Sequence, residues 1–151
     1  MALAAGDRAP LVALNDQNGE GRRSDQLAGK ALVLFFYPKD DTPGCTAEAC
    51  AFRDSYADLQ SLGAEVWGVS GDDQASHQRF ASRHDLPFPL LVDQGNALRK
   101  AFGVPNVLGL LPGRVTYVID REGVIRHVFN NLLDGAAHRN EARAALQRLA
   151  L

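Results

Sequence analysis

The chain has 151 residues, of which 46% are hydrophobic and 23% are charged. Such a length and composition are typical of one globular domain and exclude extended disorder. The 16 basic and 18 acidic residues give a net charge of −2, which removes the electrostatic reason to expect nucleic acid or an anionic membrane as a partner.

The sequence contains no internal repeat, linker or membrane-length apolar run, so we expect residues 1–151 to form a single domain. No basic segment precedes the first apolar residues, and Asp7 and Arg8 interrupt them. We therefore expect no signal peptide and a cytoplasmic protein.

The first thirty residues give weak signals, which predict a short edge hairpin and one helical turn near Leu27. Residues 31–37 are apolar without alternation, as expected of a central strand that is covered on both faces. Apolar residues then recur at spacings of three and four, which predicts a helix over residues 43–62 that ends at Gly63.

The remaining chain alternates strand and helix patterns. In order, these are a strand at 66–70, a helix at 73–84, an extended stretch at 87–92, a helix at 96–102, a hairpin of 115–119 with 124–129, and a helix at 134–149. This order predicts an α/β fold, a three-layer sandwich with a mixed central sheet and a small N-terminal β addition. A thioredoxin-like fold meets this description, and periodicity alone leaves a flavodoxin-like fold open.

The only two cysteines, Cys45 and Cys50, lie five positions apart. A chain with so few cysteines is not a secreted disulfide scaffold, so the pair indicates redox chemistry, metal binding or core packing. Thr42 suits the N-cap of the predicted helix and Pro43 its first position, which places Cys45 at the third. There the free backbone N–H groups and the helix dipole favour a thiolate, the nucleophilic form.

The segment from Phe36 to Thr46, Phe-Tyr-Pro-Lys-Asp-Asp-Thr-Pro-Gly-Cys-Thr, resembles the signature of the peroxiredoxins, specifically their Q-type branch, also called bacterioferritin comigratory protein. The resemblance extends over essentially the whole chain. Further matching segments are Glu48-Ala49-Cys50, Gly68-Val69-Ser70, Leu86-Pro87-Phe88-Pro89, Ala101-Phe102-Gly103-Val104 and Arg114-Val115-Thr116-Tyr117. The connection over residues 105–113 departs from the pattern, because it is shorter and more apolar than in some members.

The resemblance implies a thioredoxin-like fold and a thiol-dependent peroxidase that reduces hydrogen peroxide and organic hydroperoxides. Cys45 would attack the peroxide O–O bond, and the Thr42 hydroxyl would hydrogen-bond the peroxide and the sulfur. Arg114 would supply a fixed positive charge, and Pro38 would shield the thiolate from water. We expect Glu48 on the helix surface, at most supporting this group.

Attack on peroxide leaves a sulfenic acid that a thiol must resolve, and the other thiol in this chain is Cys50. Five residues of an intact helix separate the Cα atoms by about 8.7 Å, whereas a disulfide needs them within about 7 Å. The helix must therefore unwind locally. The alternative to this resolving role is that Cys50 packs in the core.

The implied partners are a peroxide and thioredoxin or a similar dithiol reductant, with no cofactor, no nucleic acid and no membrane. We expect a monomer or a weak dimer.

Two other functions remain open. A disulfide oxidoreductase normally uses Cys-x-x-Cys, which Cys45 and Cys50 do not match. A metal-binding or redox-sensing module would use the cysteines with histidines, although the spacing gives this no support. The four histidines are His77, His84, His127 and His138, and we expect the first two to be solvated.

Overall fold

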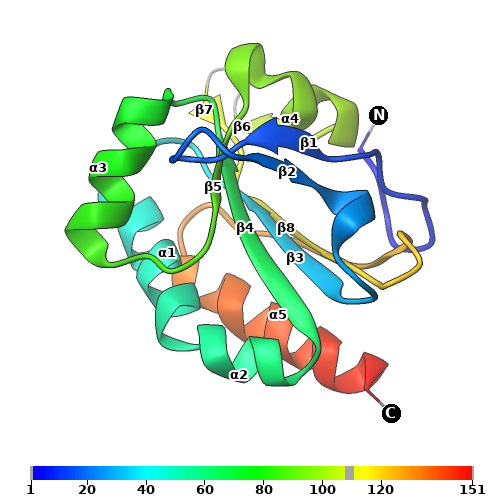
Figure 1. Ribbon diagram of the computed structural model, residues 1–151. Coiled ribbons are helices and arrows are strands. Elements are labelled where there is room, and N and C mark those ends of the chain that lie inside the picture. Colours follow the sequence, from blue (N-terminus) through cyan, green and yellow to red (C-terminus); the bar gives the residue numbers. More distant parts are fainter. Residues whose placement is uncertain (1, 108–110, 151) are drawn as a thin grey trace.

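The computed structural model describes residues 2–107 and 111–150. Five strands form one mixed sheet in the order β5-β4-β3-β8-β9 (Figure 1). The central β3 (Ala31–Phe36) runs parallel to β4 (Ala64–Ser70) and antiparallel to β8 (Val115–Ile119). The edges are β5 (Leu90–Val92) and β9 (Ile125–Asn130). The antiparallel β8 beside β3 distinguishes this sheet from an all-parallel, flavodoxin-like one.

Four helices cover one face of the sheet (Figure 1): α1 (Pro43–Asp54), α2 (Tyr56–Ser61), α3 (Gln74–His84) and α5 (Gly135–Leu149). The other face is covered by α4 (Ala97–Phe102) together with the N-terminal hairpin of β1 (Ala13–Asn15) and β2 (Gly21–Arg23). Alternate side chains of β3 enter the two cores, since Val33 and Phe35 face α1 and α5 while Leu34 and Phe36 face α4. The predicted three-layer fold is confirmed.

Short segments complete the chain, among them the 3-10 helix η2 (Gln94–Asn96) between β5 and α4. The predicted N-terminal helical turn is the 3-10 helix η1 (Ser24–Gln26). In the connection over residues 105–113, β6 (Asn106–Val107) pairs antiparallel with β7 (Leu111–Pro112), and residues 108–110 lie outside the described residues. No helix in the described part of the chain is long and apolar enough to cross a membrane.

The prediction of one helix over residues 43–62 is wrong at one point. The helix breaks at Ser55, whose backbone has φ −109° and ψ 7° and whose N–H bonds to the carbonyl of Phe52 at 3.2 Å. The apolar pattern continues across this break because both helices pack on the same face of the sheet. The site-bearing α1 is therefore a separate helix of 12 residues.

Helices α1 and α5 approach closely where Gly135, the first residue of α5, faces Glu48. A Cβ atom at Gly135 would lie 2.8 Å from both the Cβ and the backbone nitrogen of Glu48, and 2.9 Å from the carbonyl oxygen of Gly44. A side chain here would push α5 away from the start of α1.

We predict that Gly135→Ala lowers the free energy of unfolding by about 1–3 kcal/mol, the usual cost of overpacking. The control is Gly21→Ala in β2, because a Cβ there would meet only the Asn15 side-chain oxygen, at 3.7 Å. Urea unfolding of both variants measures the difference. Equal stabilities would show that α5 can move without cost.

Candidate active site

The start of α1 has the predicted arrangement around Cys45. Thr42 occupies the N-cap position with extended backbone angles, and Pro43 is the first helical residue. Cys45 follows at the third position and is only 1% exposed. Its sulfur thus lies in the first helical turn, where unpaired N–H groups favour negative charge.

The Thr42 side chain differs from the expectation. It makes no capping bond, and its hydroxyl donates instead to the carbonyl oxygen of Lys39 at 2.9 Å. Within the described residues, no hydrogen bond joins this hydroxyl to Cys45. Because its only hydrogen is used by Lys39, the Thr42 oxygen can act toward a substrate as an acceptor.

Arg114 precedes β8 and is brought to the start of α1. It is 4% exposed, its Nε donates to the carbonyl of Leu132 at 2.9 Å, and its Nη1 donates to Oε1 of Glu48 at 2.7 Å. A Cβ at Gly44 would lie 2.9 Å from Arg114 Nη2, so the glycine leaves room for the guanidinium. Burial lowers the pKa of Arg114, but the negative charges of Glu48 and Cys45 outweigh this and raise it.

Glu48 was expected on the surface, and this expectation is wrong because α5 covers that side of α1. Its side chain is 0% exposed and lies within hydrogen-bond distance of Arg114. Burial raises the pKa of Glu48 to about 8, although the positive charge of Arg114 opposes the shift. His138 of α5, also 0% exposed, lies next to it, with Nδ1 3.5 Å from Oε2 of Glu48.

A second buried arginine, Arg99 of α4, was not found from the sequence. It is 4% exposed, and its guanidinium donates to the carbonyl oxygens of Gly113 at 2.7 Å and of Tyr37 at 2.9 Å. Burial lowers the pKa of Arg99, while the negative charges of Asp93 and Cys45 partly oppose this. Through these two hydrogen bonds, Arg99 links the end of β3 to the residue before Arg114. Nothing in the pattern of a short helix distinguishes it from a surface arginine.

The loop between β3 and α1, which carries Pro38 and Thr42, is fixed by His77. Its expected solvation is wrong, since the side chain is 0% exposed. Its Nδ1 lies 2.7 Å from Asp40 Oδ2 and its Nε2 2.8 Å from the carbonyl of Leu91. Both partners only accept, so both ring nitrogens carry hydrogen. Burial lowers the pKa of His77, but Asp40 and the Leu91 carbonyl raise it by more.

The other predicted site residues are placed as follows. Pro38 lies half-buried two residues after the end of β3. Cys50 is half-buried within α1, which continues unbroken from Cys45. Both thiols are free, so the structure shows the reduced arrangement. The remaining histidines contact carboxylates rather than the cysteines, His84 with Asp41 at 3.2 Å and His127 with Glu141 at 2.8 Å.

Comparison with known proteins shows the family to which this chain belongs. The sequence profile described as the AhpC/TSA family matches residues 5–128. The chain is 49% identical over 148 residues to "Peroxiredoxin Q, chloroplastic" of Triticum aestivum, covering 97% of this chain and 68% of that protein. The chain belongs to the AhpC/TSA family, in its peroxiredoxin Q branch.

Solved structures agree with this assignment. Peroxidoxin BcpB from Mycobacterium tuberculosis is 35% identical with a TM-score of 0.89, over 97% of this chain and 98% of that one. Xanthomonas campestris bacterioferritin comigratory protein is 31% identical with a TM-score of 0.85, over 96% and 100%. The resemblance inferred from the motifs is confirmed, and the protein is a thiol-dependent peroxidase.

We predict that Arg99→Met leaves the carbonyls of Tyr37 and Gly113 without their donors. Each buried carbonyl left unpaired costs about 1–3 kcal/mol, so the free energy of unfolding falls. The rate of reaction with peroxide also falls about tenfold or more, as expected when reacting groups lose their alignment. Urea unfolding and stopped-flow kinetics measure the two effects.

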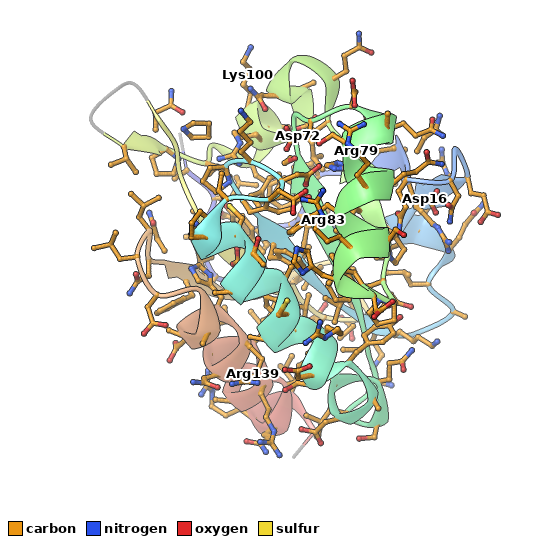
Figure 2. All side chains as sticks on the ribbon, turned by 90° about the vertical axis from the view of Figure 1, so that its left-hand side faces the viewer. Asp16, Asp72, Arg79, Arg83, Lys100 and Arg139 are labelled. Carbon is orange, nitrogen blue, oxygen red and sulfur yellow. The ribbon has the colours of Figure 1, made fainter. Side chains whose placement is uncertain are left out.

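Lys100→Met is the matched control, because the neighbouring Lys100 is exposed and projects away from the fold (Figure 2). If both variants have the same stability and the same peroxide rate, Arg99 does not hold the two strand ends in place.

Proposed function

We propose that Cys45 is the residue that attacks peroxide in this thiol-dependent peroxidase. The observation that carries the proposal is the position of its sulfur, buried in the first turn of α1 beside the guanidinium of Arg114. A helix N-terminus and a fixed cation both favour the thiolate. The same groups also stabilise negative charge on a bound peroxide as it reacts.

In the proposed reaction, the Cys45 thiolate attacks one peroxide oxygen, and an S–O bond forms as the O–O bond breaks. The electron pair of the O–O bond leaves with the second oxygen, which takes up a proton and departs as water or an alcohol. Arg114 donates to the oxygens as charge moves onto them. The Thr42 oxygen accepts the hydrogen of the peroxide, since its own hydrogen is bound to Lys39. Pro38 borders the thiolate and limits the access of water.

Cys50 then attacks the sulfenic sulfur of Cys45, which gives a disulfide and releases water. Because α1 is continuous between the two residues, its first turns unwind in this step. A dithiol protein such as thioredoxin reduces the disulfide and is itself oxidised. This cycle is completed within one chain, which supports a monomer, or at most a weak dimer, as the working form.

We propose hydrogen peroxide and organic hydroperoxides as substrates; the Xanthomonas campestris relative is described by its alkyl peroxide reduction activity. We propose the cytoplasm as the location, because reduced thiols recycled by a dithiol need a reducing compartment.

The test is peroxide consumption with thioredoxin, thioredoxin reductase and NADPH. We expect Cys45→Ser to abolish turnover, because a serine hydroxyl does not ionise where the thiol does. Cys50→Ser is the matched control, since it reduces one equivalent of peroxide and then stalls as a sulfenic acid. Turnover by Cys45→Ser would overturn the assignment of the nucleophile. Normal steady-state turnover by Cys50→Ser would show that an external thiol resolves Cys45.

We predict that oxidation unwinds the start of α1. Amide hydrogen exchange across residues 42–53 becomes faster in the oxidised protein, whereas exchange around Leu34 in β3 and throughout α3 stays the same. Intact mass shows the loss of two hydrogens per chain, and non-reducing gels show no dimer. Unchanged exchange over residues 42–53 in a protein of that mass would contradict the unwinding step.

A further inference from the structure

Arg114 is held by a buried polar cluster that the proposed reaction does not use. Glu48 and His138 are both 0% exposed. Oε1 of Glu48 accepts from Arg114 at 2.7 Å, but Oε2 has no hydrogen-bond partner among residues 2–107 and 111–150. Oε2 lies 3.5 Å from Nδ1 of His138.

The protons of His138 follow from its partners. Nε2 lies 2.7 Å from the carbonyl oxygen of Asn131, so Nε2 carries a hydrogen. Nδ1 lies 2.8 Å from the Thr116 hydroxyl, whose single hydrogen points to it. That hydrogen bond occupies the single lone pair of Nδ1, and Oε2 of Glu48 lies 3.5 Å from the same nitrogen, a distance too short for a water molecule between them. Two buried acceptors in this position repel each other unless one of them carries a proton.

We propose that reduced protein holds Glu48 as a neutral carboxylic acid whose Oε2 hydrogen lies against Nδ1 of His138 as a second, longer contact beside the Thr116 hydroxyl, and that this pair positions Arg114 without cancelling its positive charge. The inference rests on the proposed role of Cys45 as nucleophile. Glu48 and His138 are positioning residues, because they act on the reacting atoms only through Arg114.

The chemistry of the two groups places the proton on Glu48. Burial raises the pKa of Glu48 to about 8, against the opposing charge of Arg114. Burial lowers the pKa of His138 to about 4, and the Asn131 carbonyl opposes this shift. Near neutral pH the proton is therefore bound to the carboxyl group and not to the imidazole.

The charged groups around this pair come from three elements. Arg114 faces Glu48 from the start of β8, and the Cys45 thiolate lies near Arg114 on α1 itself. On α5 and at its N-cap, Glu141 and Asp134 act on His138 and raise its pKa. Among these groups, Arg114 is the one that acts on Glu48.

The protonation state of Glu48 decides how much positive charge Cys45 experiences. A neutral carboxyl oxygen still accepts the hydrogen bond from Arg114 and keeps it in place, but it does not cancel the guanidinium charge. Ionised Glu48 competes with the thiolate and the reacting peroxide for that charge. Peroxide reduction should therefore slow as pH rises through the pKa of Glu48.

The first test is the pH dependence of Cys45 oxidation by hydrogen peroxide in Glu48→Gln. Glutamine reproduces the neutral acid, because its oxygen accepts from Arg114 and its NH₂ lies against His138 as the O–H of the acid does. The wild-type rate constant should fall about fivefold or more between about pH 7 and about pH 9, following ionisation of Glu48. In Glu48→Gln this fall should be absent. An equal fall in both proteins would assign the titration to another group and overturn the proposal. A loss of about tenfold or more in Glu48→Gln at about pH 7 would show that Glu48 works ionised.

The second test compares His138→Phe with its control His127→Phe, which replaces a histidine that also contacts a carboxylate but lies outside the site. Without its acceptor, the Glu48 proton is held less firmly, so the alkaline fall should move about one pH unit lower in His138→Phe. It should stay at the wild-type pH in His127→Phe. Equal profiles for the two variants would remove His138 from the proposal.

Infrared spectroscopy of the reduced wild-type protein tests the same inference without turnover and without relying on the fold of a variant. A carbonyl band of a protonated carboxyl group should be present near neutral pH, titrate near pH 8, and be missing from Glu48→Gln. Absence of the band would overturn this inference and leave the role of Cys45 untouched. Activity in Cys45→Ser would overturn that role and leave the band in place.

Discussion

The active site depends on the antiparallel pairing of β3 with β8. Phe36, the last residue of β3, pairs with Val115, the first residue of β8. The chain that leaves β3 toward Cys45 therefore starts beside Arg114, which immediately precedes Val115. The nucleophile and its arginine are far apart in sequence, and a shift of this register by one residue would place Arg114 on the opposite face of the sheet.

Around that pairing, buried cations bind backbone carbonyls of the segments that form the site. Arg99 binds the carbonyls of Tyr37 and Gly113, Arg114 that of Leu132, and His77 that of Leu91. Taking a cation out of water is unfavourable, and these charge-assisted bonds offset part of that cost. Tyr37 and Gly113 adjoin Pro38 and Arg114, and His77 also holds Asp40 in the loop that carries Thr42. The main effect of these buried charges is therefore to position the residues of the site, and their effect on the stability of the fold is smaller.

The sequence predicted the features that local pattern determines. The uninterrupted apolar run of β3 and the Thr42-Pro43 helix start both depend on neighbouring residues, so the position of Cys45 followed from them. The sequence did not predict that Glu48 and His77 are buried, because their own helices show only where the apolar stripe lies. Whether a polar residue beside that stripe is covered depends on α5 or on the β3–α1 loop. The role of Arg99 depends likewise on contacts with two distant strand ends, which no spacing in α4 records.

Helix α1 has two requirements that oppose each other. Its ordered first turn favours the Cys45 thiolate, yet the proposed disulfide with Cys50 needs that turn to unwind. The break at Ser55 limits the change, because α2 can remain packed while α1 opens. Phe52, fully buried near the end of α1, likewise resists unwinding beyond the two cysteines.

Glu48 lies between the two cysteines, so unwinding must pull it away from Arg114. An ionised carboxylate paired with a buried guanidinium would resist this strongly, since separation leaves a buried charge without its partner. A neutral carboxyl group gives up its hydrogen bond from Arg114 and its contact with His138 without separating opposite charges, which is a smaller loss. The hydrogen bond from Arg114 to the Leu132 carbonyl lies outside α1, so it does not depend on that helix being wound. The proton proposed on Glu48 therefore serves both halves of the cycle: it directs the charge of Arg114 to Cys45 before the reaction and weakens the hold on α1 when the helix opens.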